Sequence, residues 1–134
     1  DLDRIKYYKL KSIVEYAKNL SEEEMTKIDN YICKSVPALI KEYKNIIYNK
    51  KIIGSILIRK IDDGLLLDEI FIEKEYRNNG IGSSIIKNYV LDNDDNIYLW
   101  VYKDNIKAFN LYKKLGFKIK EETNSRYYME FQKN

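Results

Sequence analysis

The sequence predicts an α/β (α+β) fold, with one mixed, mostly antiparallel sheet of six to seven strands and about four helices on its two faces. Three observations lead to this class. Short runs rich in isoleucine and leucine, separated by turn signals, fill residues 45–73 and predict an antiparallel meander. Two segments of helical periodicity alternate with further strand-like runs in the second half of the chain. A strand, helix, strand order favours a right-handed crossover, which makes those two strands parallel neighbours.

The first forty residues are expected to form one strand and then helices. Residues 3–10 mix tyrosine, isoleucine and leucine with charges and predict a first strand, and residues 12–20 predict a helix. The segment 21–24 reads Ser-Glu-Glu-Glu, a capping box in which the serine and the last glutamate satisfy free amides at a helix start. Apolar residues follow at helical spacing over 25–40, where Pro37 is expected to kink or split the helix.

The period of the apolar residues changes after Tyr43. Three strands are predicted, with turn signals at Asn49-Lys50 and Asp63-Gly64 between them, over residues 45–48, 51–60 and 65–73. The elements predicted after them are a helix over 82–91, a strand over 97–102, a helix over 105–115, and a terminal hairpin with strands 117–122 and 127–132. Gly116 fits the position just past the end of the second of these helices.

Length and composition restrict the class of protein. At 134 residues and 45% hydrophobic content, the chain is long enough for one buried core and too short for two ordinary domains, so residues 1–134 are expected to be a single domain. Its apolar runs are of strand length, well below the roughly 20 residues that span a bilayer, and its charged start lacks the apolar core of a secretory signal. We therefore expect a cytoplasmic protein with no membrane partner.

Charge and residue usage argue against several functions. The net charge of +3 and the pI of 8.7 fall short of a typical nucleic-acid-binding domain, so no nucleic-acid partner is expected. Histidine is absent and Cys33 is the only cysteine, which excludes an internal disulfide and a Cys-His nucleophile pair. Cys33 is expected to be buried and without a role. Asp92, Asp94 and Asn96 alternate as in a calcium loop, but its glycine is missing and Lys103 stands at the closing glutamate position, so no metal site is predicted.

The segment Arg77-Asn78-Asn79-Gly80-Ile81-Gly82 has features of an anion-binding loop. It lies between a predicted strand and a predicted helix, and its glycines let a phosphate approach the backbone. The first amides of the helix have no internal partner, and the helix dipole adds about half a positive charge at that end, which suits a pyrophosphate. Two glycines in a loop fit a tight structural turn about equally well, and neither the nucleoside triphosphate loop nor the three-glycine dinucleotide motif matches.

The chain resembles the GNAT superfamily of acyl-CoA-dependent N-acyltransferases over nearly its whole length. The loop matches the family's Arg/Gln-x-x-Gly-x-Gly/Ala motif through Arg77, Gly80 and Gly82. A second block, NIKAFNLYKKLGF, lies one strand later and matches through Asn105, Ala108, Tyr112, Gly116 and Phe117. The resemblance implies the family fold, with the fourth and fifth strands splayed apart to admit the acyl group. It also implies acetyl-CoA as the cofactor, released as CoA.

The resemblance implies which residues bind the cofactor. In the family, amides of the glycine loop hold the pyrophosphate, and backbone of the fourth strand pairs with the pantetheine arm. By position, these residues are Ile70, Phe71 and Ile72 in the strand and Arg77, Asn78, Asn79, Gly80, Ile81, Gly82 and Ser83 in the loop. Asn105 would touch the cofactor arm, and Tyr112 would lie near the thioester sulfur. Asn78 and Asn79 replace residues that are often small or basic in the family, which predicts weaker cofactor binding.

Catalytic candidates follow from the same resemblance. Tyr112 is the expected acid, because a thiolate leaving group needs a proton or a hydrogen bond and a phenol can supply either. The acceptor amine must lose a proton, and without histidine the base is a carboxylate or a water chain ending in one. Asp68 and Glu69 match polyamine-acetylating members, where the acid matching Asp68 would be the base and that matching Glu69 would contact substrate. Successive strand residues face opposite ways, so only one of them reaches a pocket unless a bulge intervenes.

The predicted function is N-acetylation of a small amine or polyamine, by direct attack in a ternary complex. A protein N-terminal or lysine acetyltransferase stays open, although Trp100 stands where members that act on ribosomal protein N-termini often carry glutamate. A catalytically silent acyl-CoA-binding sensor also stays open, since adjacent acids on a strand also occur as solvated or salt-bridged groups. Family members are often dimers, so a homodimer is possible, but the sequence identifies no interface.

Overall fold

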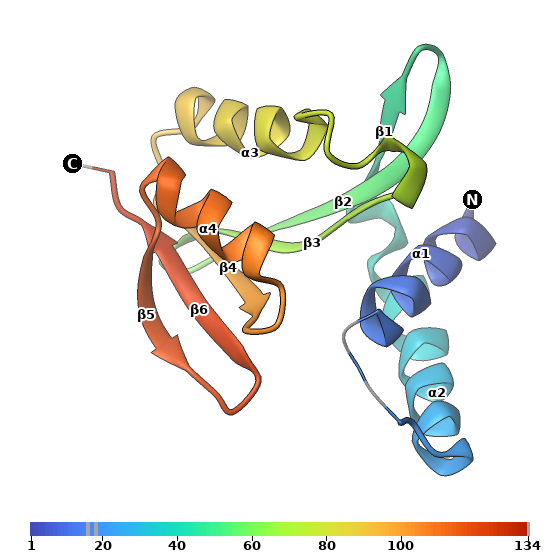
Figure 1. Cartoon of the computed structure of the whole chain (residues 1–134). Helices are drawn as coiled ribbons and strands as arrows, with labels where there is room; N and C mark the ends of the chain where they lie inside the picture. Colours follow the sequence, from blue (N-terminus) through green and yellow to red (C-terminus); the bar gives the residue numbers. More distant parts are fainter. Residues whose placement is uncertain (16, 18, 134) are drawn as a thin grey trace.

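The fold is that of a computed structural model, in which every residue except Tyr16, Lys18 and Asn134 is described. Among the described residues there are four α-helices, two short 3-10 helices and six strands (Figure 1). The helices are α1 (Leu2–Val14), α2 (Glu22–Leu39), η1 (Ile40–Glu42), η2 (Lys74–Tyr76), α3 (Ile81–Asp92) and α4 (Ile106–Leu115). The strands are β1 (Tyr43–Tyr48), β2 (Lys51–Ile61), β3 (Gly64–Ile72), β4 (Ile97–Tyr102), β5 (Lys118–Glu122) and β6 (Arg126–Phe131).

These strands form one sheet in the order β1-β2-β3-β4-β6-β5. β1, β2 and β3 form the predicted antiparallel meander. β3 and β4 are parallel neighbours connected through α3, as the strand, helix, strand order predicts. The terminal hairpin adds β6 beside β4 and leaves β5 at the edge of the sheet. The prediction of a mixed, mostly antiparallel sheet is therefore confirmed.

Helices cover both faces of the sheet, and β3 shows which pair lies on which face. Phe71 packs against an apolar cluster that contains Ile5 and Tyr8 of α1 together with residues of α2. Its neighbours Ile70 and Ile72 pack instead against the larger core, to which α3 and α4 contribute. Because successive side chains of a strand point to opposite faces, α1 and α2 lie on one face and α3 and α4 on the other. Figure 1 shows the two helix pairs well apart.

β3 and β4 separate after a short stretch of pairing. Their parallel register covers only residues 65–67 opposite residues 97–99, although β3 continues to Ile72 and β4 to Tyr102. These are the two strands that, by the family resemblance, are expected to splay apart as the fourth and fifth. They are the third and fourth strands here, because the expected first strand is a helix. The predicted splay is confirmed.

A bulge in β3 changes the direction of its side chains at the acid pair. Glu69 pairs with Leu57 of β2 and Leu67 pairs with Ile58, so Asp68 is an extra residue between two consecutive partners. An extra residue of this kind bends a strand and re-aims its side chains. The condition under which both acids can border one pocket is therefore met.

Helix α1 replaces the strand predicted over residues 3–10, so that prediction is wrong. Ile5 and Tyr8 stand three residues apart, are both buried, and pack with α2. Their β-prone residue types favoured a strand, but burial of one helical face decides the local structure. The helix predicted over 12–20 is also wrong beyond Val14, where α1 ends; two of its residues lie outside the described part.

Helix α2 begins at the predicted capping box. The Ser21 hydroxyl accepts from the Glu24 amide at 3.1 Å, and the Glu24 carboxylate accepts from the Ser21 amide at 3.2 Å. Pro37 does not split the helix, which continues to Leu39. Proline stands in the last turn, so the backbone bond that it removes lies where the helix is already ending.

Candidate functional site

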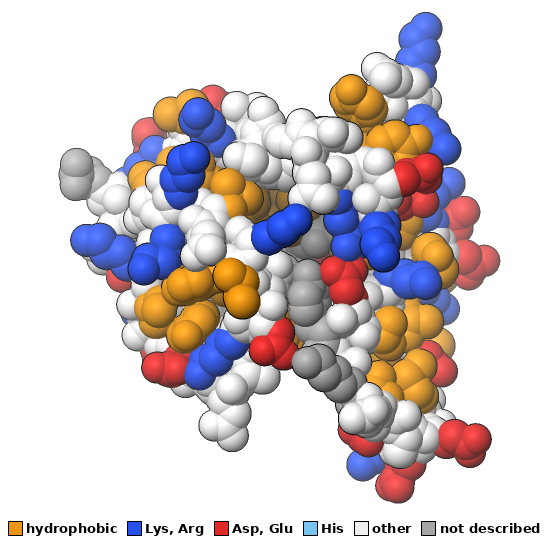
Figure 2. Space-filling model, viewed as in Figure 1, with side chains coloured by type: hydrophobic (Ala, Val, Ile, Leu, Met, Phe, Trp, Pro, Cys, Tyr) orange, Lys and Arg blue, Asp and Glu red, His pale blue; other side chains and the backbone are white. Residues whose placement is uncertain are grey.

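Two cavities meet between the separated ends of β3 and β4. One, of about 550 Å³, lies along the end of β3, the loop before α3 and the start of α4, and we call it the loop cavity. The other, of about 630 Å³, lies between the two strands and the α1–α2 pair, and we call it the strand cavity. Four residues line both: Ser12, Ile70, Asn105 and Tyr112. Side chains of both charges lie together on the face between the helix pairs (Figure 2).

The start of α3 presents backbone amides to the loop cavity. Gly80 precedes the helix in the left-handed region, at φ 77°, and no side chain caps the first turn. The amides of Ile81, Gly82 and Ser83 have no partner within the helix, and these residues line the cavity. A Cβ on Gly82 would lie 3.3 Å from Ile72 Cδ1, so a side chain at this position would crowd Ile72. An anion such as a pyrophosphate fits this end of the cavity.

Two lysines that the sequence did not reveal also line the loop cavity. Lys107, in the first turn of α4, lies with its Nζ 3.3 Å from Asn78 Oδ1, to which it donates. Lys74 belongs to η2. Their charges supply a positive field that Asn78 and Asn79 do not. Lys107 stands two positions after Asn105 of the second motif block, at the start of a helix that faces the loop, and this placement is the signal that could have identified it.

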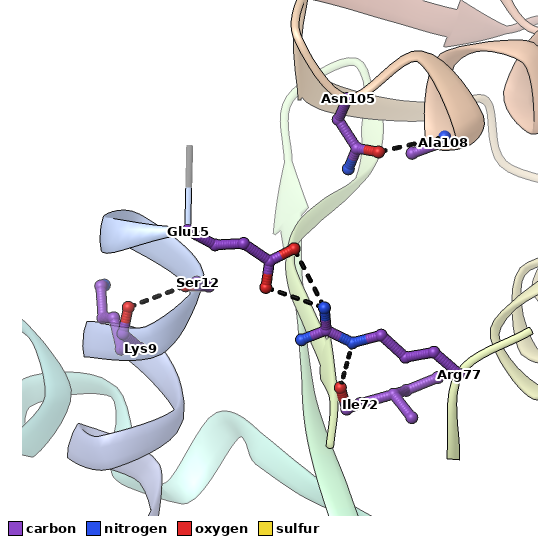
Figure 3. Close-up of polar contacts among 7 residues, drawn as sticks. All are labelled: Lys9, Ser12, Glu15, Ile72, Arg77, Asn105 and Ala108. Atoms are coloured by element: carbon purple, nitrogen blue, oxygen red, sulfur yellow. Dashed lines mark hydrogen bonds and ion pairs between the residues drawn. The ribbon is translucent and has the colours of Figure 1, made fainter. Parts of the chain in front are cut away.

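The Arg77 side chain turns toward the end of β3 and the end of α1 (Figure 3). Its Nε donates to the Ile72 carbonyl oxygen at 2.7 Å, and its Nη1 donates to both Glu15 carboxylate oxygens at 2.8 and 3.0 Å. The guanidinium also lies over the Phe71 ring, 5.3 Å from its centroid. Arg77 thus connects the two walls of the loop cavity. Glu15 could not be selected from the sequence, because it lies 62 positions away.

The loop cavity brings together nearly all residues predicted to bind a cofactor. Those that line it are Ile70, Phe71, Ile72, Arg77, Asn78, Gly80, Ile81, Gly82, Ser83, Asn105 and Tyr112. Asn79 is not among its lining residues, and its side-chain amide donates to the Tyr76 carbonyl oxygen at 3.5 Å. Asn105 caps α4, where its Oδ1 accepts from the Ala108 amide at 3.2 Å (Figure 3).

Tyr112 lies at the junction of the two cavities. Its residue is 7% exposed, and its ring centroid is 5.9 Å from that of Phe117. Gly116 ends α4 at φ 109°, and the Phe117 amide then donates to the Tyr112 carbonyl oxygen at 2.9 Å. This tight helix end places Phe117 against Tyr112. Tyr112 lines both cavities, and its phenol is a group that can donate a proton.

Asp68 and Glu69 both line the strand cavity, as the bulge allows. Asp68 Oδ2 accepts from Arg59 Nη1 at 3.4 Å, and both of these side chains are partly exposed. Glu69 has a partner on each oxygen: Lys9 Nζ lies 3.4 Å from Oε1, and the Tyr43 hydroxyl donates to Oε2. Glu69 is therefore the more firmly held of the two acids.

Lys9 and Tyr43 were not among the predicted site residues. The Lys9 side chain is only 8% exposed and comes from α1, the segment predicted as a strand. Burial raises the pKa of Tyr43, and its hydrogen bond to Glu69 raises that pKa further, so the phenol stays a proton donor. No local pattern connects these two residues with Glu69, because only the folded chain brings them together.

Trp100 of β4 and Arg126 of β6 form a further wall of the strand cavity. The Arg126 guanidinium lies 4.6 Å from the centroid of the Trp100 ring. An aromatic side chain and a cation thus occupy the side on which some members of the family that the chain resembles carry a carboxylate. This part of the cavity has no acid that could serve as a base among its described lining residues.

Other expectations concern features outside these cavities. Cys33 is exposed on α2 rather than buried, because α2 turns Ile32 and Val36 inward instead. Among the described residues, no group of three or more histidine, cysteine, aspartate or glutamate side chains could hold a metal ion. No helix in the described part of the chain is both long and apolar enough to cross a bilayer.

Comparison with known proteins gives a family and a fold. The model of the acetyltransferase (GNAT) family matches residues 10–117. PH1933 from Pyrococcus horikoshii OT3 is similar at 23% identity and a TM-score of 0.72, over 99% of this chain and 90% of that one. The PaiA N-acetyltransferase from Thermoplasma acidophilum, in complex with coenzyme A, is similar at 23% identity and a TM-score of 0.72, over 97% and 91%.

A third solved structure contains a peptide-like ligand. Arabidopsis thaliana Naa50, in complex with the bisubstrate analogue CoA-Ac-MVNAL, is similar at 23% identity and a TM-score of 0.58, over 86% of this chain and 96% of that one. At such identities, the likeness to solved structures shows the fold alone. No curated protein sequence matches the chain.

Proposed function

The chain belongs to the acetyltransferase (GNAT) family of acyl-CoA-dependent N-acetyltransferases, and we propose that it acetylates a small amine or polyamine. The observation that carries this proposal is the junction of the two cavities at Tyr112, with an acid pair in the second of them. The loop cavity suits a long donor with an anionic centre. The strand cavity, at about 630 Å³, falls within the range of small-molecule sites, which is roughly 300–1,000 Å³.

The loop cavity fits acetyl-CoA by the chemistry of its lining. The uncapped amides at the start of α3, with Lys74 and Lys107 beside them, would hold the pyrophosphate. β4 does not pair with residues 70–72, and backbone groups of this edge other than the Ile72 carbonyl oxygen, which accepts from Arg77, would bond the pantetheine arm. When bound, acetyl-CoA supplies an activated acetyl group and a thiolate leaving group. Asn105 and Tyr112 line the junction, where the thioester would lie.

The acceptor needs a base before it can attack. A primary amine with a pKa near 10.4 is about one part in a thousand uncharged at pH 7, which costs roughly 4 kcal/mol on the reactive form. We assign this role to Asp68, directly or through a water, because Asp68 is held through one oxygen by a more exposed side chain, while Glu69 is held on both oxygens. Glu69 then shapes the cavity rather than accepting the proton.

The reaction proceeds by direct attack. Asp68 takes the first proton of the ammonium and passes it to solvent. The neutral amine nitrogen then forms a bond to the acetyl carbon as the carbon–sulfur bond breaks, a second amine proton passes to Asp68, and Tyr112 Oη protonates the departing sulfur. Solvent carries the proton from Asp68 back to the Tyr112 phenolate. No covalent enzyme intermediate is needed. Cys33, the only cysteine, is exposed on α2 and lines neither cavity.

Release of free CoA thiol tests this function. Acetyl-CoA is incubated with pools of polyamines, aminoglycosides, amino acids and short peptides, and each active pool is then separated into its members. We expect release that depends on a small amine and is strongly reduced in Tyr112→Phe. Release with peptides alone would instead assign a protein acetyltransferase. Calorimetric binding of CoA without release in any pool would assign an acyl-CoA sensor.

A further inference from the structure

The strand cavity contains a ready-made site for an alkylammonium group, and Lys9 of the same chain fills it. Lys9 Nζ lies 3.4 Å from Glu69 Oε1 and 4.8 Å from the centroid of the Tyr31 ring. A carboxylate on one side and an aromatic face on the other are the surroundings in which proteins bind substrate ammonium groups. All three residues line the strand cavity.

Burial makes this arrangement a fixed part of the cavity. The Lys9 side chain is 8% exposed and that of Glu69 is 21% exposed, whereas the Arg59 and Asp68 side chains are 43% and 30% exposed. The second oxygen of Glu69 accepts from Tyr43. An ammonium buried against a carboxylate stays paired, because either charge alone would be costly to keep away from water. Asp68 is thus the acid that remains accessible to an incoming cation.

We propose that Lys9 is a specificity-determining residue that stands in for the second ammonium of a diamine, so that the enzyme prefers acceptors with a single cationic centre. This proposal rests on the proposed function and narrows its substrate class. A monoamine can place its one nitrogen at Asp68. A second cation on the substrate could not pair with Glu69, because Lys9 already does. The remaining charged lining residues, Lys27 and Arg126, are positive and would repel it.

The test compares two amines with the same four-carbon chain, butylamine and 1,4-diaminobutane, by their kcat/KM in the thiol-release assay. Wild type is expected to favour butylamine. Lys9→Ala empties the ammonium site, and the second ammonium of diaminobutane can then pair with Glu69. A hydrogen bond between charged groups is worth about 1.5–3 kcal/mol, so the diamine-to-monoamine ratio should rise roughly tenfold or more.

Two further variants separate specificity from a general loss of structure. Lys9→Arg keeps a positive charge beside the Glu69 carboxylate and should therefore keep the preference for the monoamine. Lys11→Ala removes a lysine from the same helix that also lies over an aromatic ring, with Nζ 5.5 Å from the Tyr7 centroid, but lines neither cavity. This matched control should leave the ratio unchanged.

A binding measurement tests the same idea without catalysis. Diaminobutane should raise the thermal unfolding midpoint of Lys9→Ala more than butylamine does. In wild type, diaminobutane should raise the midpoint no more than butylamine does. Equal kcat/KM for both amines in wild type, or an unchanged ratio in folded Lys9→Ala, would overturn the proposal. If wild type acetylates no amine at all, the proposed function fails, and the thermal shift alone decides whether Lys9 occupies an ammonium site.

Discussion

Arg77→Lys is expected to weaken CoA binding through the walls of the loop cavity rather than through a lost contact with the cofactor. Arg77 makes two hydrogen bonds to Glu15 and one to the Ile72 carbonyl oxygen. Lysine keeps the charge, but its single nitrogen cannot reproduce the planar guanidinium that serves both partners. The change should therefore release the end of α1 from the end of β3.

The structure sets the size of this effect. The Arg77 and Glu15 side chains are 29% and 33% exposed, so water and salt screen the pair, and we assign it about 1 kcal/mol at most. The lost bond to the Ile72 carbonyl oxygen adds about 1 kcal/mol. A total of about 1–2 kcal/mol corresponds to roughly a 5- to 30-fold change in an equilibrium constant. We therefore expect the CoA Kd to increase by no more than roughly 30-fold.

A double-mutant cycle measures this coupling. The CoA Kd is determined by calorimetry for wild type, Arg77→Lys, Glu15→Gln and the double variant, and urea unfolding checks that all four are folded. We expect Arg77→Lys to cost less affinity when Glu15→Gln is already present, because the two residues act through one contact. An equal cost in both backgrounds would refute the reasoning, since the contact between Arg77 and Glu15 would then contribute nothing to CoA binding.

Further predictions address the acid, the loop, the base and the start of α2. Tyr112→Phe should lower turnover about 100-fold or more, because it removes the proton donor, while the calorimetric CoA Kd stays nearly unchanged; full turnover would remove the acid role. Gly80→Ala forces a side chain into the left-handed region at φ 77°, so urea unfolding should show a loss of about 1–2 kcal/mol and CoA binding should weaken; unaltered binding would mean that the loop amides do not hold the cofactor. Asp68→Asn should reduce turnover more than Glu69→Gln does, and equal indifference would leave a water chain as the base. Ser21→Ala should cost about 1 kcal/mol of stability through the lost cap without changing turnover, and a loss of activity would contradict its purely structural role.

The lining of the loop cavity could be predicted well from the sequence. The loop from Arg77 to Gly82 and the block that begins at Asn105 are each local motifs, and the structure places both on one cavity. What the motifs did not show is the direction of the Arg77 side chain. Its partner Glu15 lies on a different element, at the end of a helix over residues 2–14, most of which the residue types predicted as a strand.

The lining of the strand cavity could be predicted only in part. Asp68 and Glu69 stood out as an acid pair, and alternation along the strand required a bulge before both could reach one cavity. The bulge exists because β2 and β3 pair with a register shift at this point. Register depends on both strands at once, so neither strand alone reveals it.

By itself, the sequence determined the strands and helices after residue 43, the capping box of α2, the glycine loop and the motif block of α4. These features depend on residues a few positions apart, whose spacing and backbone preferences are visible in any window of the chain. Only the tertiary structure decided that residues 2–14 form a helix and that Lys9 pairs with Glu69. The physical reason is that burial against a distant segment outweighs local propensities of a fraction of a kcal/mol per residue, about 0.7 at most for ordinary residues.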